Sequence, residues 1–240
     1  MPDFVWLDVV AVTFWLLAGG LSLYFSIGNA RIWTSISTGF FLIFVSEGYL
    51  VAPWAHAPRL MAIHSIVGTI AIMVLTHGFQ EYYVFSRTLE AGGSKLAVYL
   101  TTSVVVLASV VFLLINPAPS ATVLRNIRII ENGNWVFLSL INLDMIRKIY
   151  AQVRGTPMAR GFVAFALVFA LVFLWRGSEL YLQVYAWDGA WREVLAALGV
   201  AGDVKMLGRV VFSSTVHRVA GLAASVSVGA TFLYLFRLLR

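Results

Sequence analysis

Seven long apolar runs constrain this chain more than any other feature of its sequence. A membrane-spanning helix needs about 20 consecutive, predominantly apolar residues. Because a lipid bilayer offers the backbone no hydrogen-bond partner, each run is expected to form an α-helix. The sequence therefore predicts an all-α integral membrane protein with seven transmembrane helices. The runs cover residues 4–27, 33–53, 60–85, 96–116, 133–151, 161–186 and 209–236.

The composition supports this class of protein. Of the 240 residues, 60% are hydrophobic and 12% are charged, whereas soluble domains carry about 25% charged residues. The N-terminal Met1-Pro2-Asp3 lacks the basic stretch of a signal peptide, so the first run is expected to remain as a helix. The absence of cysteine excludes disulfides and thiolate-ligated iron–sulfur clusters. A cofactor would therefore be held by histidine, carboxylate or packing.

The basic residues indicate how the chain is oriented in the membrane. The net charge is +6, and most Lys and Arg residues lie near the ends of the apolar runs, where anionic lipid rather than nucleic acid is the expected partner. With the N-terminus outside, nine basic residues lie on the inner side: Arg31, Arg87, Lys95, Arg147, Lys148, Arg154, Arg160, Arg237 and Arg240. Six then lie outside: Arg59, Arg125, Arg128, Arg192, Lys205 and Arg209. This bias predicts a multi-pass protein of a bacterial-type inner (cytoplasmic) membrane, with its C-terminus in the cytoplasm.

Two sequence phrases occur twice in the chain. The pattern Ser-Glu-x-Tyr-Leu occupies residues 46–50 and again residues 178–182, inside an apolar run each time. A histidine followed four residues later by a glycine occurs within residues 63–68 and again within residues 216–221. This indicates an internal duplication, in which helices 1–3 and helices 5–7 form two three-helix repeats joined by helix 4. An even number of crossings separates the repeats, so they are expected to run parallel, related by an axis along the membrane normal.

The duplication also predicts the organisation of the chain. Residues 1–94 form the first repeat, residues 95–130 the linker helix with an outer loop, and residues 131–240 the second repeat. The second repeat has about 21 extra residues between its two phrases, which fall within residues 187–208. Apolar residues recur there at helical spacing against charged ones, which predicts an amphipathic helix in the outer interface: Trp187, Trp191, Val194, Leu195 and Leu198.

The duplicated phrases place ionisable groups inside the membrane. Under the predicted topology Glu47, His64, Glu179 and His217 lie at one depth, in the outer third of the bilayer. Buried charges are costly in lipid, so they normally face a partner, a cavity or a cofactor. Arg176, three residues before Glu179, is the expected ion partner of that glutamate. One interpretation is a structural network of Arg, Glu and His that holds the two repeats together.

The second interpretation is a cofactor site, because Gly68 and Gly221 each lie one helical turn after a duplicated histidine. An imidazole next to a helix surface without side chains suits a tetrapyrrole. The imidazole nitrogen would ligate the metal, and the macrocycle would pack against the backbone at the glycine. His64 and His217 are therefore candidate metal ligands, as the axial pair of a b-type haem or as ligands of separate haem or chlorophyll-type pigments. Close helix packing also explains such glycines, and both explanations stay open.

A second pair, His77 and Glu81, lies near the predicted inner end of the third run, without a counterpart in the second repeat. The pair could form a further haem site, handle protons, or anchor the helix at the inner interface. Asp144 is expected to pair with Arg147 or Lys148. His56 is expected to be a surface residue.

These features favour an integral membrane subunit of an energy-transducing electron-transfer complex, respiratory or photosynthetic, rather than an autonomous enzyme. It would hold a tetrapyrrole or contribute to a quinone site near the outer leaflet, and Glu47 or Glu179 would accept protons from a quinol. Two alternatives are a small-solute carrier and a non-catalytic scaffold subunit of a larger membrane complex. The 3+1+3 order of helices resembles the SWEET sugar transporters, although the Pro-Gln signature of their relatives is absent.

Overall fold

The described chain is entirely helical in the computed structural model, which describes residues 5–29, 32–51, 57–88, 96–185 and 204–239. The prediction of an all-α chain is confirmed for these residues. The predicted interfacial helix at 187–208 falls mostly on residues 186–203, outside the described part, and α8 already begins at Val204. The helices are α1 (Val5–Asn29), α2 (Ile32–Val51), α3 (Pro58–Thr88), α4 (Leu96–Ile115), α5 (Ala121–Val153), α6 (Ala159–Tyr185) and α8 (Val204–Leu239).

The helix α5 differs most from its predicted bounds, because it begins at Ala121 rather than near residue 133. Pro117 and Pro119 separate it from α4, since proline does not continue a helix. Ser120 then caps the new helix, and its side chain accepts a hydrogen bond from the Val123 amide at 3.4 Å. The three extra turns carry Glu131 into the interior of the protein, where it is 1% exposed.

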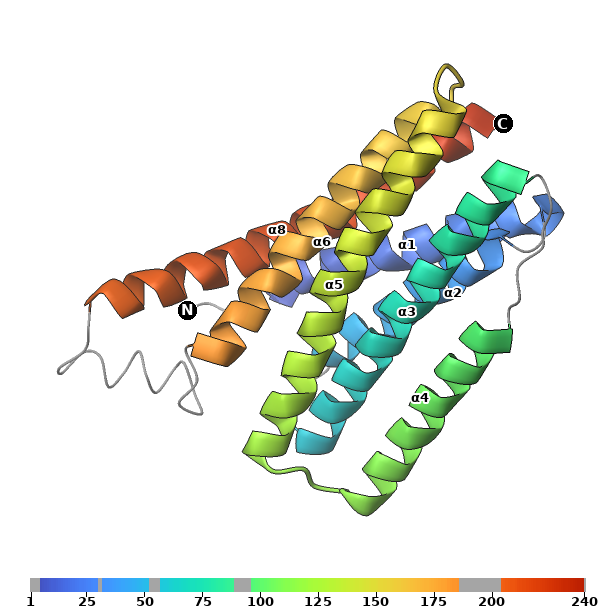
Figure 1. Cartoon of the computed structure of the whole chain (residues 1–240). Helices are drawn as coiled ribbons and strands as arrows, with labels where there is room; N and C mark the ends of the chain where they lie inside the picture. Colours follow the sequence, from blue (N-terminus) through green and yellow to red (C-terminus); the bar gives the residue numbers. More distant parts are fainter. Residues whose placement is uncertain (1–4, 30–31, 52–56, 89–95, 186–203, 240) are drawn as a thin grey trace.

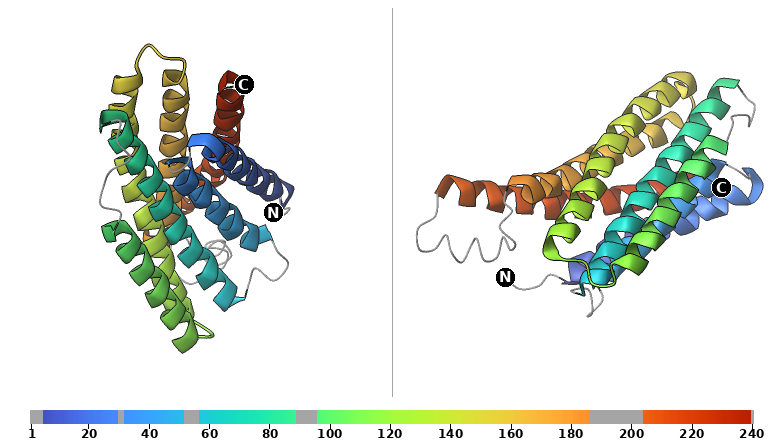
Figure 2. Two further views of the ribbon diagram at one scale, coloured as in Figure 1. Left: turned by 90° about the vertical axis from the view of Figure 1, so that its right-hand side faces the viewer. Right: turned by 60° about the horizontal axis from the view of Figure 1, so that its bottom comes forward.

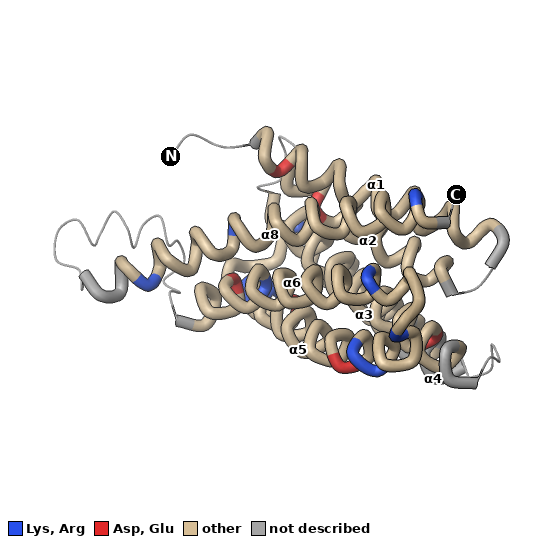
Figure 3. The backbone as a smooth tube through the Cα atoms, turned by 90° about the horizontal axis from the view of Figure 1, so that it is seen from above, with Lys and Arg blue, Asp and Glu red and all other residues tan. Residues whose placement is uncertain are grey.

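Five of the described helices are long and apolar enough to cross a membrane, namely α1, α2, α3, α6 and α8. The segments are Trp6–Ile27, Trp33–Val51, Pro58–Phe85, Ala159–Val184 and Gly208–Leu238. Large apolar side chains also face outward, including Leu107 and Leu114 of α4, which are 65% and 71% exposed. Figure 3 shows long stretches of tube without any charged residue. These surfaces are compatible with a multi-pass membrane protein that contacts lipid.

Six helices form a closed ring. Around the ring α1 packs on α2, α2 on α3, α3 on α5, α5 on α6, α6 on α8, and α8 on α1. The remaining helix, α4, packs only on α3 among the described helices and lies at the edge of the bundle (Figures 1 and 2).

Aromatic rings fill the centre of this ring of helices. Phe40, Phe165 and Phe232 meet edge to face, with centroids 5.3–5.4 Å apart where Phe232 contacts the other two. Such aromatic pairs stabilise a bundle beyond the area that they bury. Small residues bring the helices close together, as membrane packing requires: a Cβ on Gly78 of α3 would lie 2.9 Å from the backbone nitrogen of Ile36 on α2. Trp15 stacks with both Phe40 and Trp175, so the aromatic core extends to the ring of Trp175.

Candidate functional site: a buried charged cluster

Arg176 of α6 is the centre of a charged cluster inside the bundle. Its Nη2 lies 2.5 Å from Oε1 of Glu47 on α2, and its Nη1 lies 3.3 Å from Oε1 of Glu131 on α5. The guanidinium carbon is 3.9 Å from the ring centroid of Trp175 and 4.9 Å from that of Trp135. Arg176 is 4% exposed. Two carboxylates and two indole faces thus hold one cation away from solvent.

His64 of α3 is the fourth charged or titratable member of this cluster. Its Nδ1 lies 2.8 Å from the carbonyl oxygen of Ser46, which fits donation from Nδ1–H, and the Ser46 hydroxyl donates to the His64 carbonyl at 3.0 Å. Its Nε2 lies 3.9 Å from Oε1 of Glu131. When Nδ1 carries the proton of a neutral imidazole, Nε2 is the basic nitrogen. The basic nitrogen of His64 therefore faces Glu131.

The other duplicated pair, Glu179 and His217, lies beside this cluster and is less enclosed. Nδ1 of His217 is 3.6 Å from Oε2 of Glu179 and 3.2 Å from the carbonyl oxygen of Trp175. Gln183 donates to Glu179 at 2.9 Å. The His217 side chain is 30% exposed, against 4% for His64. The structure thus places all four predicted ionisable residues on inner faces of the bundle. The pair of Glu47 and His64 is more deeply buried than the pair of Glu179 and His217.

The predicted partner of Arg176 was wrong. Sequence spacing favoured Glu179 on the same helix, whereas the guanidinium forms its ion pairs with Glu47 and Glu131 on neighbouring helices. A residue three positions along a helix offers only a weak surface pair. In the closed ring, carboxylates from two other helices reach Arg176 in the interior. Arg176 therefore joins α2, α5 and α6, as the structural interpretation of the cluster required.

Glu131 is the functional residue that sequence reasoning missed. Its helix was expected to start after it, because Arg125, Arg128 and Glu131 interrupt the apolar pattern. A signal was nevertheless present. Glu131, Trp135, Ser139 and Asn142 recur at intervals of four, four and three residues, which places polar groups along one face of a helix. A polar stripe on a helix surrounded by apolar helices indicates an inward-facing, functional side.

The two glycines do not leave room for a flat cofactor. A Cβ on Gly68 would lie 2.5 Å from Oε1 of Glu131, and a Cβ on Gly221 would lie 2.9–3.1 Å from the indole of Trp175. The space one turn from His64 and from His217 is therefore filled by side chains of the protein itself. The described residues also hold no group of three or more His, Cys, Asp or Glu suited to a metal ion. In this arrangement the residues do not fit a tetrapyrrole at either histidine.

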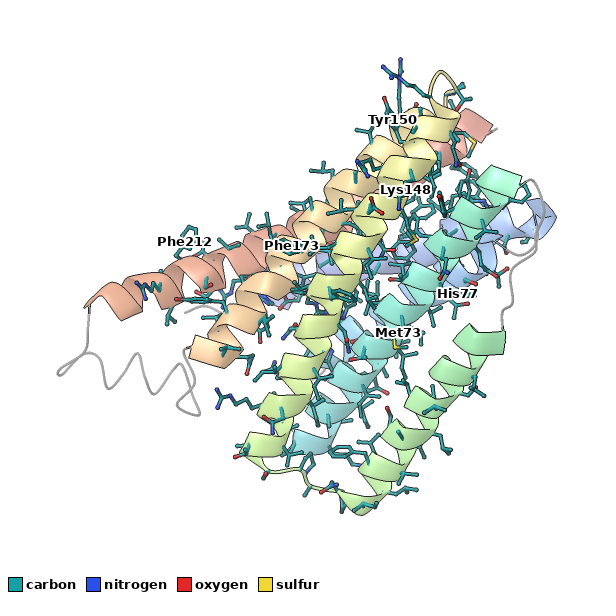
Figure 4. All side chains as sticks on the ribbon, in the orientation of Figure 1. Met73, His77, Lys148, Tyr150, Phe173 and Phe212 are labelled. Carbon is teal, nitrogen blue, oxygen red and sulfur yellow. The ribbon has the colours of Figure 1, made fainter. Side chains whose placement is uncertain are left out.

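The second predicted pair, His77 and Glu81, forms a separate polar site on α3. Nε2 of His77 is 3.5 Å from Oε1 of Glu81, and the Ser35 hydroxyl of α2 donates to Oε2 of Glu81 at 2.9 Å. Figure 4 shows Met73 and His77 following one another along α3, on the side turned toward α4. His77 is therefore not part of the Arg176 cluster.

Asp144 pairs as predicted, with Lys148 at 2.6 Å and Arg147 at 3.1 Å, on an exposed part of α5. His56 lies outside the described residues.

Comparison with known proteins adds no family to these observations. No family model matches the chain, and neither a curated protein nor a solved structure matches it. The function is therefore argued from the site itself.

Proposed function

We propose that this chain is an integral membrane subunit of an energy-transducing electron-transfer complex, in which the buried cluster accepts protons from a quinol and passes them on. The observation that carries this proposal is the arrangement of Glu47, Glu131 and His64 around a single cation, Arg176. The four side chains come from four helices and lie within 2.5–3.9 Å of a partner. All are 2–14% exposed.

The charges of the cluster explain why it would bind a proton. Two carboxylates face one guanidinium, so the cluster carries one excess negative charge while His64 is neutral. Net charge inside a membrane protein is costly, and one proton on Nε2 of His64 or on a carboxylate removes it. Because His64 Nε2 and Glu131 Oε1 are 3.9 Å apart, the same proton can be shared between these two residues. A site of this kind takes up and releases protons with little rearrangement.

A quinol is the proton donor that this setting favours. Oxidation of a quinol to a quinone releases two electrons and two protons inside the membrane. The two electrons would pass to a redox centre of a partner subunit, and the protons to carboxylate and imidazole groups of this chain. Glu179 and His217, which are partly exposed beside the cluster, would receive them first. The quinone expectation is thus retained, whereas the filled spaces beside Gly68 and Gly221 disfavour a haem or pigment.

The helix order supports the finer architecture that this proposal uses. The contacts of α1 with α2 and α2 with α3 correspond to those of α5 with α6 and α6 with α8. The contact of α3 with α5 corresponds to that of α8 with α1. We infer two parallel three-helix repeats joined by α4, with the N-terminus outside a bacterial-type inner membrane. The exposed apolar face of α4 would contact lipid or other subunits of the complex.

Infrared difference spectroscopy of the purified protein in nanodiscs tests the proposal. A buried protonated carboxylic acid gives a carbonyl-stretch band apart from the amide bands, and the band moves in D₂O. We expect such a band to change when a reduced quinone analogue is added and an oxidant accepts the electrons. The change should be lost in Glu131→Gln or Glu47→Gln and kept in the control Asp144→Asn, whose carboxylate is at the surface.

Two results would contradict the proposal. If neither the carboxylic-acid region nor the imidazole bands change on quinol oxidation in the assembled complex, the cluster is excluded as the proton acceptor. A Soret band in the visible absorption spectrum that disappears in His64→Ala or His217→Ala would instead support a haem. The side chains of Glu131 and Trp175 would then have to move away from Gly68 and Gly221.

A carrier of small solutes is the second candidate, and the closed ring with α4 outside it favours this alternative. A 3+1+3 carrier would be built from two three-helix units with a separate linking helix, and buried charged groups between the units would bind a polar solute. Uptake of a solute into liposomes, lost in Arg176→Met, would support the carrier.

A further inference from the structure

Beyond the ion pairs of the cluster, α5 carries a file of buried polar groups, one of which, Trp135, also packs its ring against Arg176. Asn132, Trp135, Ser139 and Asn142 are each 0–1% exposed. One polar atom of each has no hydrogen-bond partner among the described residues: Asn132 Oδ1, Trp135 Nε1, Ser139 Oγ and Asn142 Oδ1. More than nine in ten buried polar groups in proteins have a partner, and an orphan costs free energy. Four orphans along one helix require an explanation.

The spacing of these residues makes them a continuous file rather than scattered exceptions. From Glu131 the side chains recur at positions 135, 139 and 142, on one face of α5. At a rise of about 1.5 Å per residue, Glu131 and Asn142 are separated by about 16 Å along the helix axis. The file therefore starts in the charged cluster and runs toward the other end of the bundle.

The file continues on α3. Nδ2 of Asn142 donates to Oγ1 of Thr76 at 2.9 Å. The next residue, His77, pairs with Glu81, and Ser35 of α2 donates to Glu81. His64 and Glu81 are separated by about 26 Å along α3, at about 1.5 Å per residue. This is most of the roughly 30 Å thickness of a hydrocarbon core. Polar groups thus extend through most of the predicted membrane depth on this one side of the bundle.

The opposite seam of the ring, between α8 and α1, shows that the polar file is not a general property of the packing. There Phe14 fills the space beside Gly229, in very close contact with the position of an added Cβ. The buried hydroxyl of Ser22 on α1 donates to Ala18 of its own helix at 2.7 Å, so it is satisfied locally. Among the described residues, α5 thus carries several buried polar atoms without a partner, whereas the contact of Gly229 with Phe14 between α8 and α1 is apolar.

We propose that water molecules join these polar groups into a path that conducts protons between the Arg176 cluster and the His77–Glu81 pair. Water is the usual partner of buried polar atoms that lack a protein partner. Each hydroxyl or water accepts a proton on one side and releases one on the other, so no group gains net charge. The path rests on the proposed function only in taking the cluster as the site where protons are exchanged.

The test measures how fast the cluster exchanges its proton for deuterium. After a jump into D₂O, the carboxylic-acid band of the cluster is followed by infrared spectroscopy in nanodiscs. In Asn142→Leu an apolar side chain interrupts the path, and the exchange rate is expected to fall about tenfold or more, the factor that corresponds to about 1.4 kcal/mol of barrier. Ser139→Ala, a smaller change, should slow exchange in the same direction. The matched control is Ser22→Ala, which removes an equally buried hydroxyl from α1, outside the proposed path.

The possible outcomes separate this inference from the proposed function. The band present in every variant, with slower exchange only in the two path variants, supports the path. The band present with equal exchange rates in all variants overturns the path and leaves the cluster as a proton site. A wild type that shows neither a carboxylic-acid band nor a protonated-imidazole band sinks the proposed function and the path with it. A circular dichroism spectrum of each variant shows whether it folds, and Ser139→Ala carries the test if Asn142→Leu does not.

Discussion

Replacing Gly68 by alanine tests whether the glycine beside His64 exists to make room for Glu131. A Cβ at this position would lie 2.5 Å from Oε1 and 3.3 Å from Cδ of Glu131. Ordinary contacts of this kind are about 3.5 Å or longer, so the carboxylate must move by about 1 Å. That movement disturbs the Nη1–Oε1 contact of 3.3 Å with Arg176 and the approach to His64. The substitution therefore acts on the cluster without removing any of its charges.

The magnitude follows from two opposing effects. Alanine is favoured over glycine inside a helix by about 1 kcal/mol. Breaking one partner of a buried ion pair costs about 3–5 kcal/mol. We therefore expect the free energy of unfolding of Gly68→Ala to fall by about 2–4 kcal/mol. Gly48→Ala is the matched control, because it lies next to Glu47 in α2 and, apart from its own stretch of helix, no described residue comes within 4 Å of its added Cβ. Its stability should stay the same or rise by up to about 1 kcal/mol.

The measurement is unfolding of the purified protein by increasing SDS in mixed micelles, followed by circular dichroism. A second background makes the test specific. If the loss comes from the clash with Glu131, then Gly68→Ala should cost little in a Glu131→Ala protein, because coupled residues give non-additive effects. Equal stability of Gly68→Ala and Gly48→Ala would refute the reasoning, and so would the same loss with and without Glu131.

Three further substitutions test other parts of the structure by the same unfolding assay. Arg176→Met leaves two buried carboxylates without their cation and should lower the free energy of unfolding by about 3–5 kcal/mol. Adding Glu131→Gln removes one negative charge and should restore part of this stability. A double variant that is less stable than Arg176→Met would contradict the charge balance. Gly229→Ala should cost about 1–3 kcal/mol through overpacking against Phe14, and an unchanged stability would argue against closure of the ring between α8 and α1. Asp144→Asn should change stability little, because its ion pairs with Lys148 and Arg147 are exposed, and a large loss would place this part of α5 in the interior.

Each of the seven apolar runs overlaps a described helix, because length and hydrophobicity favour a helix in lipid. Five of these described helices, rather than seven, are long and apolar enough to cross a membrane. Among the helix bounds, the start of α5 was the main exception. Polar residues such as Arg125 and Arg128 belong to its first turns, and hydropathy alone cannot distinguish a polar helical extension from a loop. The cap at Ser120, just after Pro119, was the local signal for the earlier start.

The repeated phrases correctly brought Glu47, His64, Glu179 and His217 to the interior, but they could not predict the partners of these residues. A repeated phrase indicates which helix face a side chain occupies, whereas ion pairs depend on which neighbouring helices reach that face. Arg176 illustrates the difference, since its carboxylates come from α2 and α5. The glycines illustrate it again. The pattern His-x-x-x-Gly correctly indicated a gap in the surface of each helix, but side chains of the protein occupy both gaps.

The residues of the two repeated phrases thus have unequal surroundings, and under the proposed function this difference would have a consequence. His64 is sealed against Glu131, while His217 remains 30% exposed beside Glu179. A proton site that no donor can reach cannot exchange protons. A site that is accessible from every side cannot move protons in one direction. The partly exposed pair of Glu179 and His217 is joined to the buried cluster through Trp175 and Arg176. The pair therefore offers one entrance for protons. The polar file on α5 then offers one exit, because the seam between α8 and α1 has no such file among its described residues. Divergence of the two halves after duplication would therefore be what gives the bundle a direction for proton movement.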